Sequence, residues 1–257
     1  MAKTRLDKLV HERGLAPSRE RAHALILAGR ILVNEQKIEK PGAAVDLTSA
    51  LRVLGDEQPY VSRGGLKLAA ALANWKIVLT GKVAIDVGAS TGGFTDCMLQ
   101  HGAARVIAID TGYGQIDARL RSEARVRLLE RTNARYLTPE QLGESPEFLA
   151  MDVSFISATL VLPAVVSSMR AAAAQAGSAR RLEAVVLVKP QFEAGREHVG
   201  KGGIVRDPEA QRMAVQKVSV AMRGLGFHDI EVIDSPILGS EGNKEFLLHA
   251  VDYGEVG

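Results

Sequence analysis

Two lysines and two carboxylates stand at positions from which they could meet in the ligand crevice of an α/β sheet: Lys67, Asp152, Lys189 and Glu245. Asp152 and Lys189 each follow four apolar residues that read as a buried strand. Open α/β sheets bind their ligands at the carboxyl ends of the strands. An ionisable group beside a core needs a partner, and two ammonium and two carboxylate groups would neutralise one another. The pattern therefore predicts either a catalytic set at one edge of a sheet or ordinary ion pairs at strand ends.

A second chemical signal is the stretch from Ile85 to Phe94, which reads as a buried strand, a glycine turn and a helix start. Glycine adopts positive φ and has no Cβ, so a ligand can approach the backbone closely. Free N–H groups at the helix start favour a carboxylate or another anion. The next apolar strand ends in Asp110, the usual position for a carboxylate that binds a ribose. The spacing predicts a cofactor that contains a nucleoside.

The elements that must position these residues alternate between helix and strand from residue 63 onward. A helix at 65–74 carries Lys67, and the last strand carries Glu245. Apolar strands separated by helices favour a parallel sheet with both faces covered. The pattern thus predicts an α/β domain whose strands lie at 83–87, 105–110, 126–129, 148–152, 185–189, 230–233 and 245–251.

The first 54 residues read as a separate, smaller α+β unit. Leu6, Leu9 and Val10 share one helical face, and Ser18 is a good N-cap for a second helix. Strands are expected at 31–33 and 51–54, with a polar turn at 34–37. Residues 55–59 have the composition of a linker. We therefore expect two domains, at 1–59 and 60–257.

Composition limits the possible functions. Aromatic residues make up only 4% of the chain, which argues against a single-strand binder built from stacking platforms. The net charge is +2, but residues 1–30 hold seven basic and three acidic side chains. Cys97 is the single cysteine, so neither an internal disulfide nor a cysteine metal cluster is expected. No secretion signal or spanning segment is recognised, and we expect a cytoplasmic protein that is a monomer or a weak dimer.

The glycine turn resembles that of FtsJ-type S-adenosylmethionine methyltransferases. Ser90 stands where a dinucleotide-binding dehydrogenase would have glycine, so that alternative is the weakest. The resemblance implies a Rossmann-like domain with a seven-stranded, mostly parallel sheet, S-adenosylmethionine as cofactor, and a Lys-Asp-Lys-Glu tetrad for ribose 2′-O-methylation. The tetrad maps onto Lys67 in Ser62 to Leu68, Asp152 in Met-Asp-Val-Ser-Phe, Lys189 in Val-Lys-Pro-Gln-Phe, and Glu245 in Gly-Asn-Lys-Glu-Phe.

The N-terminal unit resembles the S4-type RNA-binding fold of a small-subunit ribosomal protein. The similarity lies in Arg5-Leu6-Asp7, Ser18-Arg19, Ala22, Gly29 and Val33-Asn34. Joined to the tetrad domain, it makes the whole chain similar to the TlyA family. This resemblance implies 2′-O-methylation of cytidine in ribosomal RNA of the 16S type, the 23S type or both, with ribosomal subunits as partners. Family members are also catalogued as haemolysins.

The resemblance assigns roles to further residues. A ribose hydroxyl is a poor nucleophile, and Lys189 is the candidate base or orienting group, because desolvation and a second ammonium nearby favour loss of its proton. No metal is required. The expected cofactor contacts are Asp86, Gly88, Ala89, Ser90, Thr91, Gly92, Gly93, Phe94, Asp110, Tyr113, Asn133, Asp152 and Phe155. The expected RNA contacts are Arg5, Arg19, Arg21, Arg30 and Arg63.

Two other function classes stay open at this point. A membrane-lytic protein would fit the haemolysin label, although no spanning helix or long basic amphipathic stripe is recognised. A catalytically inactive RNA-binding protein would keep the fold without using the tetrad. Liposome leakage tests the first alternative, and cofactor titration tests the second.

Overall fold

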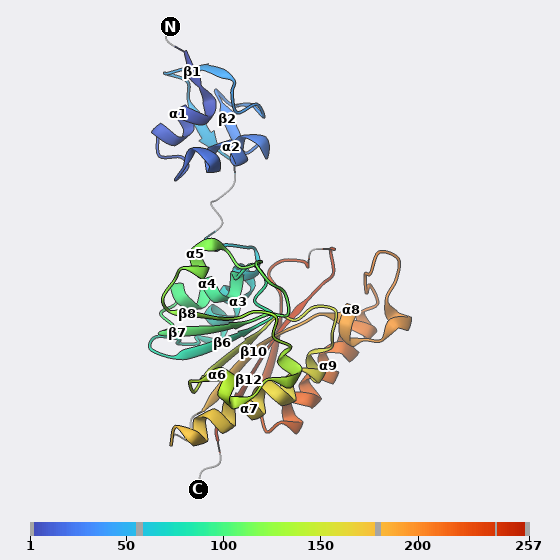
Figure 1. The fold of residues 1–257 in the computed structure, drawn as a ribbon. Coiled ribbons are helices and arrows are strands. Elements are labelled where there is room, and N and C mark those ends of the chain that lie inside the picture. Colours follow the sequence, from blue (N-terminus) through green and yellow to red (C-terminus); the bar gives the residue numbers. More distant parts are fainter. Residues whose placement is uncertain (1–2, 55–58, 178–180, 240, 255–257) are drawn as a thin grey trace. The chain divides into compact units, whose positions relative to one another are not determined.

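The chain separates into two compact units, residues 1–58 and 59–257. A computed structural model describes residues 3–54, 59–177, 181–239 and 241–254, and its ribbon is drawn in Figure 1. Most of the predicted linker, residues 55–58, lies outside the described residues.

The smaller unit packs two helices against short strands. Ser18 caps the second helix by accepting a hydrogen bond from the backbone of Arg21, as its side chain predicts. Leu6, Val10, Ile26 and Ile31 are fully buried at the centre. Its elements are β1 (Lys3–Arg5), α1 (Leu6–Glu12), α2 (Arg19–Leu27), β2 (Ile31–Val33), β3 (Gln36–Lys37), β4 (Ala44–Asp46) and β5 (Leu51–Val53). β1 pairs with β4, and β2 lies between β3 and β5, all antiparallel.

The turn predicted at 34–37 is confirmed at residues 34 and 35 and is wrong at residues 36 and 37. Asn34 and Glu35 have φ values of 49° and 63°, so these two residues alone make the turn. Two-residue hairpins favour positive φ at both central positions, since that twist matches the flanking strands. Gln36 and Lys37 then pair with β2 as β3. β1 and β4, at three residues each, carry too short a pattern to be recognised from sequence.

The larger unit is built on a seven-stranded sheet in the order β11-β12-β10-β9-β6-β7-β8. β12 runs antiparallel to both of its neighbours, and the other pairings are parallel. This confirms the predicted α/β fold with a mostly parallel sheet. The strands are β6 (Val83–Val87), β7 (Arg105–Ile109), β8 (Val126–Leu129), β9 (Phe148–Met151), β10 (Leu182–Val188), β11 (His228–Asp234) and β12 (Phe246–Asp252).

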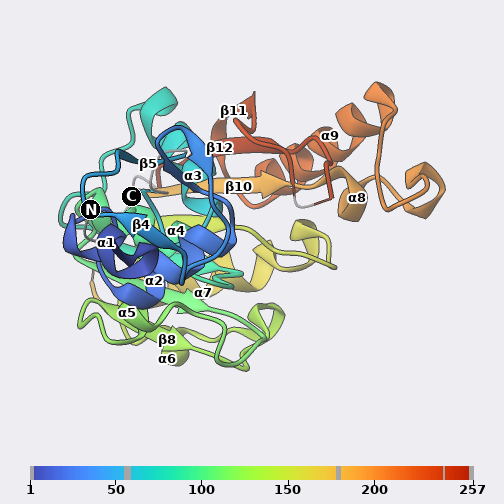
Figure 2. The same cartoon turned by 90° about the horizontal axis from the view of Figure 1, so that it is seen from above.

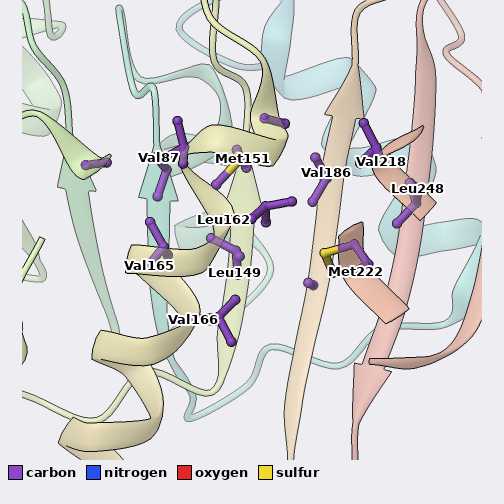
Figure 3. Packing of buried hydrophobic residues seen from close by; sticks show 14 of the residues in the cluster. Val87, Leu149, Met151, Leu162, Val165, Val166, Val186, Val218, Met222 and Leu248 are labelled. Atoms are coloured by element: carbon purple, nitrogen blue, oxygen red, sulfur yellow. The ribbon is translucent and has the colours of Figure 1, made fainter. Parts of the chain in front are cut away.

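Helices cover both faces of this sheet. On one face α7 (Leu162–Gln175) and α9 (Pro208–Gly224) pack Val165, Val166 and Val218 against strand residues such as Leu149 and Val186 (Figure 3). On the other face lie α3 (Gly64–Trp75), α4 (Gly93–Gln100) and α5 (Ala118–Arg121). Side chains alternate across a strand, so a strand covered on both faces is apolar on both sides. All seven residues of β10 are buried, and six of them are apolar; the exception is Glu183, which pairs with His249.

Shorter elements connect these layers. They are α6 (Pro139–Leu142), α8 (Pro190–Glu193) and 3₁₀ turns at Ala134–Tyr136, Ala158–Leu160 and Arg196–His198. Thr138 and Gln141 form a capping box at the start of α6. The long helix α7 begins at Leu162, after the 3₁₀ turn that Ser157 caps. No helix in the described parts of the chain is long and apolar enough to cross a membrane.

Candidate active site

Lys67 and Glu245 form a buried ion pair. The Nζ of Lys67 lies 2.5 Å from Oε2 of Glu245, and the two side chains are 10% and 3% exposed. Lys67 lies on α3, and Glu245 immediately precedes β12 rather than lying on it as predicted. Residues 178 positions apart in the sequence are thereby joined. Because both charges are shielded from water, each needs the other.

Asp152 and Lys189 form a second pair at the ends of neighbouring strands. Lys189 Nζ is 2.6 Å from Asp152 Oδ1 and donates a hydrogen bond of 2.6 Å to Ser154 Oγ. Asp152 follows the last residue of β9, and Lys189 follows the last residue of β10. The Lys189 side chain is 11% exposed and that of Asp152 is 21% exposed. This pair is therefore partly open to solvent, whereas the Lys67–Glu245 pair is more enclosed.

Strand register brings the two pairs to the same edge of the sheet. Val188 of β10 is opposite Phe246 of β12 in an antiparallel pairing. The same register carried one residue further places Lys189 opposite Glu245. β9 runs parallel on the other side of β10, so its carboxyl end, with Asp152, lies at that edge as well. The structure thus brings the four predicted tetrad residues together, in two ion pairs.

The glycine turn after β6 makes close contact with the end of β9. Gly88 has a φ of 87°, and a Cβ at this position would collide with the carbonyl oxygen of Asp152. Asp86, on β6 two residues before Gly88, is fully buried and accepts a 2.6 Å hydrogen bond from Thr95 Oγ1. Burial raises the pKa of Asp86 to about 7. Its Oδ1 has no hydrogen-bond partner among the described residues.

A cavity of about 450 Å³ opens beside the glycine turn. This volume lies within the range of small-molecule sites. Asp110, at its wall, accepts hydrogen bonds from the backbone N–H groups of Ser90 (2.8 Å) and Gly112 (2.7 Å). These two bonds orient the carboxylate and leave lone pairs free for hydroxyl donors. The predicted residues at the cavity wall are Gly88, Ser90, Asp110, Asn133, Asp152 and Phe155.

Of the residues at the cavity wall, Phe155 is 91% exposed, at a φ of 63°. The remaining predicted cofactor residues do not line this cavity. Phe94 belongs to the hydrophobic core, and Tyr113 is exposed with the Arg131 guanidinium 4.3 Å from its ring centre. The others that do not line the cavity lie on β6, in the glycine turn or at the start of α4: Asp86, Ala89, Thr91, Gly92 and Gly93.

The arginines predicted to bind RNA have unequal freedom. Arg5 and Arg19 both pair with the buried carboxylate of Asp7, at 2.9 and 3.3 Å. The hydrogen bond from Arg5 lowers the pKa of Asp7 to about 2. Arg30 donates to the carbonyl oxygen of Leu54, and on the larger unit Arg63 donates to that of Leu238. The side chain of Arg21 is exposed and makes no hydrogen bond or ion pair with described residues.

Several site residues were missed at the level of sequence. Ser154 accepts from Lys189, and Thr95 donates to Asp86. Thr132 lines the cavity next to Asn133. The side chains of Glu193 and Asn243 are buried and accept hydrogen bonds from the backbone N–H groups of Ala158 and Val205. A single hydroxyl, carboxylate or amide residue follows no spacing pattern. Its side-chain contact can be predicted from sequence only where the residue stands at a helix cap or in an Asx turn.

Comparisons with known proteins match both units. The family model described as FtsJ-like methyltransferase matches residues 60–251, and that of the S4 domain matches residues 4–49. The chain is 44% identical, over 96% of its length and 89% of the relative, to the 16S/23S rRNA (cytidine-2′-O)-methyltransferase TlyA of Mycobacterium tuberculosis. It is 38% identical, over 96% of its length and 99% of the relative, to Hemolysin A of Brachyspira hyodysenteriae.

A solved structure is similar as well. It is a protein from Streptococcus thermophilus that also carries a hemolysin name, 41% identical, with a TM-score of 0.72 over 98% of this chain and 89% of the other. The FtsJ-like model covers most of the chain, and the relatives extend over both units. This chain therefore belongs to the FtsJ-like methyltransferase family and is a methyltransferase that carries an S4 domain.

Proposed function

We propose that this protein transfers a methyl group from S-adenosylmethionine to the ribose 2′-hydroxyl of a cytidine in ribosomal RNA, using Lys67, Asp152, Lys189 and Glu245. The observation that carries the proposal is the convergence of these four side chains at one edge of the sheet, with Asp152 on the wall of the cavity. The cytidine and the ribosomal RNA come from the printed name of the Mycobacterium tuberculosis relative.

The cavity suits a nucleoside cofactor with an amino-acid end. Asp110 offers an oriented carboxylate for the ribose hydroxyls, and Gly88 lets a ligand approach the backbone. The unpartnered Oδ1 of Asp86 is a buried acceptor close to this turn. When bound, S-adenosylmethionine supplies an electrophilic methyl group on a sulfonium.

The two lysines have different tasks in this mechanism. The Lys67 ammonium is bound to Glu245 and is nearly enclosed, so it fixes the position of that carboxylate. The Lys189 ammonium donates to Ser154 and is ion-paired with Asp152. For the reaction it releases one proton to solvent, and the lone pair that this exposes accepts the O–H of the 2′-hydroxyl and holds that oxygen in line with the methyl group. As the methyl group is transferred, the hydroxyl proton passes to Lys189, which becomes an ammonium again.

The small unit contributes RNA binding in this proposal. Arg5, Arg19 and Arg21 are exposed on or beside its two helices, and their charges can meet phosphates. The pairing of Arg5 and Arg19 with Asp7 holds those two side chains in place without covering them, since they remain about half exposed. Binding through such contacts should weaken as salt rises. We expect the protein to act in the cytoplasm on ribosomal subunits.

The proposal is tested with purified protein, S-adenosylmethionine and ribosomal subunits that lack the modification. Digested RNA analysed by mass spectrometry should contain 2′-O-methylcytidine after incubation with the wild type and none with Lys189→Ala. Methylation of a base, or of the ribose of a nucleoside other than cytidine, would overturn the cytidine assignment. Absence of any methyl transfer, with both 30S and 50S subunits, would overturn the proposed substrate class.

A further inference from the structure

The segment that joins α8 to α9, residues 194–207, extends beyond the carboxyl end of β10. Figures 1 and 2 both show it, in orange, projecting past the strand from which Lys189 follows. It begins five residues after Lys189 and contains the 3₁₀ turn Arg196–His198. We call this segment the 194–207 loop. Neither its backbone nor its side chains have a part in the mechanism above.

The start of the loop is anchored by Glu193. Its side chain is 3% exposed and accepts hydrogen bonds from the backbone of Ala158 (2.6 Å) and from Ser157 Oγ (2.5 Å). Lys217 of α9 completes the set, with Nζ 3.2 Å from the carboxylate. Ser157 and Ala158 belong to the segment that follows Asp152. The loop is thus tied at its base to the chain that carries one tetrad residue.

The far end of the loop is anchored by Asn243, which is fully buried. Its Oδ1 accepts from the backbone N–H of Val205 at 3.0 Å, and its Nδ2 donates to the carbonyl oxygen of Gly203 at 2.9 Å. Asn243 precedes Glu245 by two residues. Both ends of the loop are therefore fixed to segments that carry the tetrad, and the loop keeps a defined position beside the active site.

Three exposed cations of the loop have side chains that form no hydrogen bond or ion pair with the described residues. They are Arg196, Lys201 and Arg206. The two carboxylates of the segment are otherwise engaged: Glu197 lies 3.8 Å from His198 Nε2, and Asp207 caps α9 by accepting from Glu209. Some exposed arginines elsewhere on the same unit do form carboxylate pairs, as at Arg119, Arg121 and Arg125.

We propose that Arg196, Lys201 and Arg206 bind phosphates of the substrate RNA beside the target nucleotide, as a contact site separate from the small unit. This inference rests on the proposed function, which makes RNA the substrate. Cations held near a catalytic edge without a protein partner are available to a polyanion. Phosphate contacts position an RNA strand without reading its sequence. The loop would therefore raise the affinity for RNA and leave the chemical step to the tetrad.

The test compares the triple variant Arg196→Gln/Lys201→Gln/Arg206→Gln with a control, Lys76→Gln/Arg223→Gln. The control removes two exposed cations, equally without described partners, at the ends of α3 and α9 and hence at the opposite edge of the sheet. The probe is the ribosomal subunit that the wild type binds best. Filter binding between 50 and 200 mM salt gives affinity, and methyl transfer gives kcat and KM.

The slope of log affinity against log salt is negative, and the loss of three phosphate contacts should reduce its magnitude by about 2 to 3. The KM for RNA should rise roughly tenfold or more, with kcat at saturating RNA within about twofold of wild type. The control should keep both the wild-type slope of log affinity against log salt and the wild-type KM. A triple variant with wild-type slope and KM, or a control that loses as much, would overturn the inference. If the wild type binds RNA without methylating it, the proposed function fails, while the slopes still decide the role of the loop.

Discussion

Breaking the Lys67–Glu245 pair should cost both stability and activity, and the two losses can be separated. Glu245→Gln keeps the shape of the side chain and removes its charge. The Lys67 ammonium, with a side chain 10% exposed and its counter-charge formerly 2.5 Å away, is then left enclosed and unpaired. Removing one partner of a buried pair costs roughly 3–5 kcal/mol. For a unit of about 200 residues, a loss of this size lowers the melting temperature by roughly 6–20 °C.

The companion variant Lys67→Met/Glu245→Leu removes both charges at once. Replacing a buried pair by apolar side chains of similar size is often neutral or stabilising. We therefore expect it to recover most of the stability lost in Glu245→Gln but none of the methyl transfer, because the tetrad is absent from both. Lys244→Gln, which loses an exposed pair with Asp234, should change stability by less than about 1 kcal/mol.

Urea unfolding and a tritium methyl-transfer assay measure these two effects on the same preparations. A Glu245→Gln variant that unfolds within about 1 kcal/mol of the wild type and turns over at a comparable rate would refute both roles of the pair. A double variant that recovers activity together with stability would contradict it in another way, since the pair would then serve the fold alone.

Three further predictions concern single residues. Lys189→Ala should lower methyl transfer by roughly 10²-fold or more while S-adenosylhomocysteine still binds within a few-fold by calorimetry; turnover close to wild type would remove Lys189 from the mechanism. Asp110→Asn, which places an amide where two backbone N–H groups need acceptors, should weaken cofactor binding by roughly tenfold or more, and an unchanged Kd would exclude the ribose role. Burial raises the pKa of Asp86 from 3.8 to about 7, so the folded state binds this proton more tightly than the unfolded state does. The stability it contributes is complete below pH 4 and is lost as the pH rises through about 7. Between pH 4 and pH 8 the wild type should therefore lose roughly 4 kcal/mol relative to Asp86→Asn in urea unfolding, and parallel pH profiles for the two proteins would show that Asp86 does not titrate in this way.

The positions of the strands along the chain, and the placing of Asp152 and Lys189 at strand ends, could be predicted because both depend on regular patterns. Runs such as Val185–Val188 are apolar at every position, which marks strands buried on both faces, and the polar residue that follows lies at the carboxyl end. Asp152 and Lys189 therefore had to lie near one edge if their strands were neighbours. Sequence does not show that β9 and β10 are neighbours, and register alone brings Lys189 opposite Glu245.

The contacts that fix the site could not be predicted, because they join isolated residues to backbone groups. Glu193 binds Ala158 across 35 positions, and Asn243 binds Val205 across 38 positions. Neither partner is marked by its residue type, since any residue offers a backbone N–H. Tyr113 and Phe94 were expected at the cofactor because they lie beside the glycine turn or the ribose-binding strand. Tyr113 is exposed and contacts the Arg131 guanidinium, and Phe94 packs in the hydrophobic core.

The central claim, that the four convergent side chains carry out ribose methylation of ribosomal RNA, is tested most directly by a nucleotide-resolution map of 2′-O-methyl groups in cells. Ribosomal RNA would be compared between cells that lack the protein and cells that carry either the wild type or Lys189→Ala at equal abundance. The account predicts one or more cytidines whose methylation appears only with the wild type. Identical maps in all three strains, or full methylation with Lys189→Ala, would contradict it.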